Sequence, residues 1–212
     1  MSTVALATTG GFIDTSSALL HIAGKWPRPV TVIEADPDGG RLACRHGLRP
    51  GLSDLVSTLR LGRPIRVADR VSAVPVVSAP PDPDETIRAI DSMTPMVGSL
   101  GAILGTDVLF SVGVLRPRSP SDGITRSSDA RLLIMRCTLD DVAAVLYRHR
   151  LLESFGRWSI LTSRGPLTTL QVSRVIRWPI LAEIMSFGRC DVSLLSQRVA
   201  EFVAFVGSGT EQ

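Results

Sequence analysis

Residues 4–16 read VALATTGGFIDTS, a short apolar run that leads into two adjacent glycines. From Thr15 to Ala23 the apolar side chains recur at helical spacing, which predicts a strand, a glycine turn and a helix in direct succession. Such a turn can cradle phosphate, because the backbone N–H groups and the helix dipole point at the anion. Taken alone, the segment fits a phosphate loop and an ordinary tight strand–helix connection about equally well.

Beyond this segment, β-branched apolar runs alternate with segments of helical spacing. The predicted strands are Val30–Ile33, Ala73–Ser78, Asp107–Leu115, Ala130–Met135, Ser159–Thr162 and Val175–Leu181. The predicted helices are Leu52–Leu59 with Ser53 as cap, Asp84–Leu104 divided near Pro95, Thr138–Glu153 and Asp191–Val206. This alternation predicts an α/β three-layer sandwich with a mostly parallel central sheet. Because no repeat or linker interrupts it, residues 1–212 are expected to form a single domain.

The composition is typical of a globular protein, with 44% hydrophobic residues and a mean hydropathy of +0.24. The formal net charge is only +3 and the basic residues are scattered, so DNA contact gains weak support. Cys44, Cys137 and Cys190 lie too far apart for a disulfide framework or a metal motif, which favours a reducing compartment. We find no signal peptide and no apolar run long enough to span a membrane, so a cytoplasmic protein is expected.

The glycine turn resembles the deviant Walker A motif, KGGxGKTT, of the ParA/MinD family of P-loop ATPases. Gly10, Gly11, Thr15 and Ser16 match that motif. Four later segments resemble family segments in the same order. They are VIEADPDG at 32–39 (family LIDADPQG), GLRPGLSDL at 47–55, DVLFSVG at 107–113 before switch II, and SDARLLIMRCTLDDV at 128–142 (family ADRVLLVVRPTLDDV). The resemblance implies a P-loop NTPase fold and assigns a vestigial nucleotide site to Gly10, Gly11, Thr15, Ser16 and Asp36.

The departures from the family pattern bear on catalysis. The family's early signature lysine falls on Thr9, its third glycine on Ile13, its phosphate lysine on Asp14 and its switch II aspartate on Ser111. Phosphoryl transfer needs positive charge to stabilise the γ-phosphate oxygens as the bond breaks. Lys25, the only lysine of the chain, lies beyond the first helix and is a poor replacement. Efficient ATP hydrolysis is therefore not expected, and no catalytic residue is assigned.

Several of these residues also have simpler interpretations. Asp36 is either a remnant of the switch or a turn and capping residue, and Asp14 fits an N-terminal helix acid that favours the dipole. His21, His46 and His149 show no metal-binding spacing, so no metal site is expected. The helix predicted over Asp191–Val206 has one basic residue, which favours packing on the sheet over membrane binding.

The favoured hypothesis is a catalytically inactive pseudo-ATPase that acts as an interaction or positioning module. The resemblance implies a protein partner, either a second copy or a related active ATPase. No cofactor is expected, although residual ATP or ADP binding without hydrolysis stays open. The alternatives are a divergent ATPase of the partition type, with Mg²⁺-dependent turnover, and a DNA-binding adaptor, with a steep salt dependence.

Overall fold

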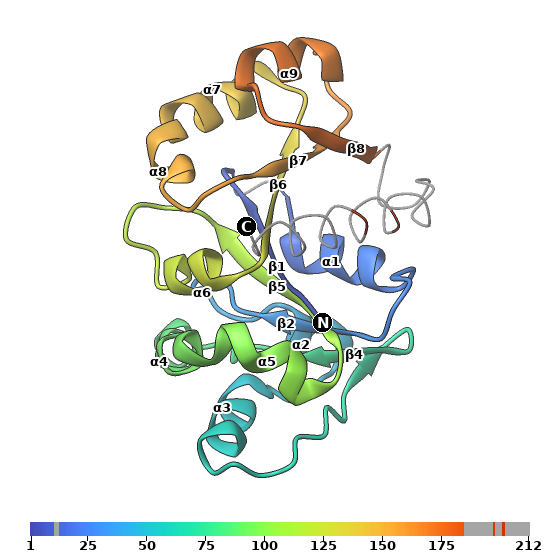
Figure 1. The fold of residues 1–212 in the computed structure, drawn as a ribbon, viewed down its shortest axis with the longest axis vertical. Coiled ribbons are helices and arrows are strands. Elements are labelled where there is room, and N and C mark those ends of the chain that lie inside the picture. Colours follow the sequence, from blue (N-terminus) through green and yellow to red (C-terminus); the bar gives the residue numbers. More distant parts are fainter. Residues whose placement is uncertain (11–12, 185–196, 198–200, 202–212) are drawn as a thin grey trace, which may run out of the picture.

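The computed structural model describes residues 1–10, 13–184, 197 and 201. An eight-stranded sheet runs through this part in the order β3-β4-β2-β5-β1-β6-β7-β8 (Figure 1). The strands are β1 (Thr3–Thr8), β2 (Val30–Glu34), β3 (Arg70–Val71), β4 (Val74–Val77), β5 (Asp107–Val114), β6 (Ala130–Arg136), β7 (Ser159–Ser163) and β8 (Ile180–Ile184). Every pair is parallel except the short antiparallel pair β3–β4.

Helices cover both faces of the sheet. They are α1 (Thr15–Ala23), α2 (Leu42–His46), α3 (Leu52–Arg60), α4 (Pro83–Met93), the 3₁₀ turn η1 (Thr94–Met96), α5 (Val97–Leu104), α6 (Asp122–Ser127), α7 (Leu139–Tyr147), α8 (His149–Glu153) and α9 (Thr169–Ile176). Apolar side chains of α1 and α2 form one core cluster, and those of α3 to α9 form the other. The predicted three-layer α/β fold is therefore confirmed.

The central strand β1 shows why the sheet is covered on both sides. Its side chains alternate between the faces: Val4 and Leu6 join the core under α1, whereas Ala5 and Ala7 join the opposite core. All six residues of β1 are buried. A strand that is apolar on both faces is typical of parallel sheets with two helical layers.

One predicted strand has the wrong bounds. Residues 175 and 176 of the predicted strand Val175–Leu181 belong to helix α9, and the strand begins only at Ile180. Val172 and Ile176, four residues apart, bury one face of α9. The helix begins with a capping box in which the Thr168 hydroxyl accepts from the Gln171 N–H, and the Gln171 side chain accepts from the Thr168 N–H. The β-branched composition of the segment misled the prediction, and this cap was the signal it missed.

Other predicted elements differ in extent. The long helix over residues 84–104 divides at Thr94–Met96 around Pro95, as predicted. The helix over residues 138–153 is interrupted at Arg148, which leaves α7 and α8. Ser53 is not the cap of α3, because Gly51 occupies that position and the Ser53 hydroxyl donates to Glu85. The helix predicted for Asp191–Val206 lies outside the described residues.

The strand order brings three chain segments together at one end of the sheet. Strand β5 lies between β1 and β2, and in its register Ser111 pairs with Leu6 of β1 and with Glu34 of β2. The N-terminus of α1 follows β1 at this carboxyl end. In open α/β sheets, ligands bind at the carboxyl ends of the strands, so the fold places the candidate site here.

The capping box of α9 generates a stability prediction. Replacing Thr168 by Ala removes the acceptor of the Gln171 N–H and should lower the free energy of unfolding by about 1 kcal/mol. Thr169→Ala is the matched control, because the Thr169 side chain takes no part in the cap within the described residues. Chemical denaturation of both variants measures the difference. Equal stability of the two variants would show that the cap contributes nothing.

Candidate functional site

The N-terminus of α1 is capped by an acidic side chain of the same chain. Asp14 Oδ1 accepts hydrogen bonds from the backbone N–H groups of Ser16 (3.1 Å) and Ser17 (3.3 Å). Asp14 Oδ2 accepts from the Ser17 hydroxyl at 2.8 Å. The free N–H groups at a helix N-terminus are the groups that bind phosphate in phosphate loops. The Asp14 carboxylate therefore occupies part of the anion site that the loop would offer to a ligand.

The charge of Asp14 is balanced by Arg45 of helix α2. The Arg45 guanidinium forms an ion pair with Asp14 and also donates to the Ser17 hydroxyl at 2.9 Å. About half of the Arg45 side chain is exposed, so solvent screens this pair. Asp14 and Arg45 thus supply both the anion at the helix terminus and its counter-ion.

A chain of hydroxyl groups runs beneath the helix terminus. Thr15 Oγ1 lies 2.7 Å from Ser111 Oγ, which lies 3.0 Å from Ser16 Oγ. The Ser16 hydroxyl donates to Glu34 Oε1 at 2.9 Å. Since an ionised carboxylate only accepts and each hydroxyl has one hydrogen, the donors must run from Thr15 to Ser111 to Ser16 to Glu34. All four side chains are buried.

The carboxylate of Glu34 gathers donors from three further backbone positions. It accepts from the N–H groups of Arg41 (2.9 Å), Leu42 (3.2 Å) and Ala79 (3.2 Å), and its residue is fully buried. Burial raises the pKa of Glu34 above its ordinary value, and these hydrogen bonds oppose that rise. A Cβ on Gly40 would lie 2.0 Å from the Ala79 oxygen and 2.9 Å from Glu34 Oε2, so only glycine fits there.

Asp36 belongs to a neighbouring cluster. Its Oδ1 accepts from the Asp38 N–H at 3.0 Å, and burial raises the pKa of the Asp36 carboxyl. Gly113 of β5 has φ +68°, and a Cβ there would lie 2.3 Å from Asp36 Oδ1. The Asp38 carboxylate pairs with both terminal nitrogens of Arg116, at 2.9 and 3.2 Å. Asp36 therefore packs against the β5 backbone.

The loop between β1 and α1 is held by short-range and long-range contacts. The Thr8 hydroxyl donates to the Gly10 carbonyl at 3.1 Å and accepts from the Gly10 N–H at 3.3 Å. The Arg148 guanidinium, from the junction of α7 and α8, donates to the Thr9 carbonyl at 2.7 Å. Gly11 lies outside the described residues. Arg148 thus brings a positive charge to the loop from a distant part of the sequence.

The structure brings Thr15 and Ser16 into one network with Ser111, and it separates Asp36 from that network. Sequence reasoning missed the central position of Glu34, to which it gave less weight than Asp36. It also missed Arg45 and Arg148, because only lysine was considered as a replacement cation. Within the described residues, no group of three His, Cys, Asp or Glu side chains is arranged to hold a metal ion.

No protein-family model matches the sequence, and no curated protein is found to resemble it. Solved structures share its fold. The septum site-determining protein MinD of Pyrococcus horikoshii OT3, complexed with Mg-ADP, matches with a TM-score of 0.69 and 16% identity over 96% of this chain and 98% of that chain. A ParA family ATPase from Chlorobium tepidum TLS matches with a TM-score of 0.69 and 12% identity, covering 100% of this chain and 93% of that one.

A chain of the MinC:MinD cell division protein complex of Aquifex aeolicus matches with a TM-score of 0.67 and 11% identity, over 98% of this chain and 96% of that chain. These likenesses show that the fold is that of MinD and ParA-type P-loop ATPases. In the described part of the chain, no helix is both long and apolar enough to cross a membrane.

The residues present do not fit a magnesium-bound nucleotide. The N–H groups of Ser16 and Ser17 are already hydrogen-bonded to Asp14, and the hydroxyl of Thr15 is hydrogen-bonded to Ser111. In a phosphate loop, a hydroxyl at this position would reach Mg²⁺. A phosphate charge about 4 Å from the Asp14 carboxylate would be repelled by about 4 kcal/mol at an effective dielectric constant near 20. We therefore derive no step of nucleotide chemistry at this site.

The hydroxyl chain generates a prediction with a built-in control. Ser111→Ala removes the acceptor of Thr15 and should lower the free energy of unfolding by about 1–2 kcal/mol, because buried hydroxyls lose their partners. Ser159 on β7 is also fully buried, but its hydroxyl has no hydrogen-bond partner among the described residues. Ser159→Ala should therefore be neutral or stabilising. Denaturant unfolding measures the free energy of unfolding of both variants. A similar loss of stability in both would contradict the hydrogen-bonded network.

Proposed function

We propose that this chain is a catalytically inactive relative of the ParA/MinD-type ATPases and acts as a protein-interaction or positioning module. One observation carries the proposal: Asp14 caps the very helix terminus at which a phosphate loop binds its ligand. The N–H groups of Ser16 and Ser17 are thereby bonded to a side chain of the same chain. The shared fold supports the proposal in general terms, since it is the scaffold of MinD and ParA-type proteins.

The partner is proposed to be a protein that recognises this scaffold without a nucleotide signal. MinD of Aquifex aeolicus is found in a complex with MinC, which illustrates that this scaffold serves in protein assembly. For the present chain, the partner would be either a second copy or a related active ATPase. Sedimentation analysis of the purified protein, alone and with added ATP, distinguishes a nucleotide-independent dimer from a monomer.

A divergent ATPase is the second candidate, and the position of Arg148 favours it. Its guanidinium contacts the Thr9 carbonyl of the loop and would have to release that oxygen to meet a phosphate. This candidate predicts Mg²⁺-dependent turnover that disappears in Arg148→Ala and Asp36→Ala. The inactive scaffold predicts no turnover in the wild type.

Calorimetric titration with ATP and ADP, with and without Mg²⁺, tests the proposed function. The wild type should show no binding at millimolar nucleotide, because Asp14 holds the helix N–H groups and repels phosphate. Asp14→Lys combined with Ile13→Gly restores the family residues and should bring measurable binding.

The matched control is Asp14→Ser with Ile13→Gly, which keeps a capping hydroxyl but adds no positive charge. Binding by the lysine variant alone would identify the loop as a phosphate-loop remnant. Micromolar binding by the wild type would overturn the proposal that Asp14 excludes phosphate from the N-terminus of α1. No gain in the lysine variant would count against any nucleotide ancestry of the loop.

A further inference from the structure

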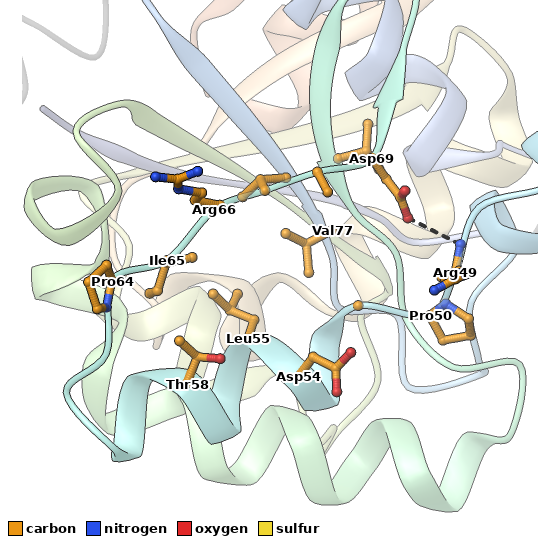
Figure 2. Close-up of a pocket in the computed structure, with 14 residues that line it drawn as sticks. Arg49, Pro50, Asp54, Leu55, Thr58, Pro64, Ile65, Arg66, Asp69 and Val77 are labelled. Atoms are coloured by element: carbon orange, nitrogen blue, oxygen red, sulfur yellow. Dashed lines mark hydrogen bonds between the residues drawn. The ribbon is translucent and has the colours of Figure 1, made fainter.

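A hollow of about 450 Å³ lies at the edge of the sheet. It is enclosed by helix α3, strand β4 and the segment of residues 64–69 (Figure 2). Figure 2 shows the side chains of Leu55, Ile65 and Val77 pointing toward one another across it. Its volume falls within the range of about 300–1,000 Å³ that is usual for ligand sites. The hollow has room for a large apolar side chain.

One wall of the hollow is an extended segment, residues 64–69. Along residues 64–70, Ile65, Val67 and Asp69 are half-buried, whereas the residues between them are exposed, as in a strand. Asp69 is fixed, because its carbonyl accepts from the Val76 N–H (2.9 Å) and its carboxylate accepts from the Arg49 N–H (3.1 Å). Residues 65–68 make no backbone hydrogen bond within the described part of the chain. Unpaired edge backbone of this kind is a template for another extended chain.

The chain around the hollow carries more positive than negative charge, with Asp54 and Asp69 in the wall beside Arg49 and Arg66. Residues 49–70 carry five arginines and two aspartates, a formal charge of +3 that equals the formal net charge of the whole chain. All five arginines are exposed, and none pairs with a carboxylate within the described residues. A second copy that docked through the same edge would bring like charge and be repelled at this surface. The edge is complementary to an acidic segment.

We propose that this edge binds an extended acidic segment of a partner protein. The backbone of that segment would pair with residues 65–68, and one of its apolar side chains would enter the hollow between Leu55 and Val77. Its carboxylates would face Arg63 and Arg66. The inference rests on the interaction role proposed above, which it deepens by naming the class of partner.

A labelled peptide that alternates glutamate with valine is the probe, and fluorescence anisotropy measures its binding. The wild type should bind it and should reject the same peptide with lysine in place of glutamate. Arg63→Glu with Arg66→Glu should weaken binding by about tenfold, since two attractions become repulsions. Arg157→Glu with Arg174→Glu, at two exposed arginines outside residues 49–70, is the charge-matched control and should leave affinity unchanged.

Hydrogen exchange supplies a readout of backbone pairing. Saturating peptide should slow exchange of the amides of residues 65–68, while thermal melts verify that both variants stay folded. Absence of peptide binding, or binding without this protection, would overturn the proposal. So would binding of a short oligothymidylate through the same arginines in place of the peptide, with a steep salt dependence. Titration with ATP and ADP tests the N-terminus of α1 and does not depend on peptide binding. Failure of the peptide to bind is therefore distinguishable from failure of the inactive-scaffold proposal.

Discussion

The buried carboxylate of Glu34 is the interaction on which the end of the sheet depends. A fully buried charge is tolerated only where enough donors surround it, and here they come from α1, from the start of α2 and from Ala79 after β4. Three loops that are distant in sequence are thereby fixed to the end of β2. Gly40 is required beside it, because any side chain would collide with the Ala79 carbonyl.

The arrangement of side chains at the N-terminus of α1 depends on Glu34. Ser16 is oriented by Glu34, and through Ser111 the same chain of hydroxyls orients Thr15. The helix terminus is then closed by Asp14 with Arg45 as counter-ion. Because the Ser16 and Ser17 N–H groups are already bonded to Asp14, a phosphate that used them would first have to break these contacts. The contacts at the N-terminus of α1 are thus consistent with the absence of a lysine from residues 8–16.

Much of the fold followed from the sequence. The alternation of β-branched runs with helical periods predicted a parallel sheet covered on both faces, and Pro95 marked the break between α4 and α5. The failures have local causes. Residues 175 and 176 were assigned to a strand, but burial of Val172 and Ile176 on one face and the Thr168 cap place them in helix α9. The sequence also did not reveal that Arg148 would interrupt the helix while its side chain reached the loop after β1.

The sequence by itself determined the architecture, the position of the glycine turn and the absence of a lysine from it, because these depend on residue type and short-range spacing. Only the tertiary structure decided which side chains contact the glycine turn and the N-terminus of α1. Glu34, Ser111, Arg45 and Arg148 meet the loop from four separate elements. Their convergence depends on strand order and register, which place β5 between β1 and β2. Likewise, the positive charge of residues 49–70 is visible in the sequence, but the hollow it surrounds arises only where residues 64–68 diverge from β4.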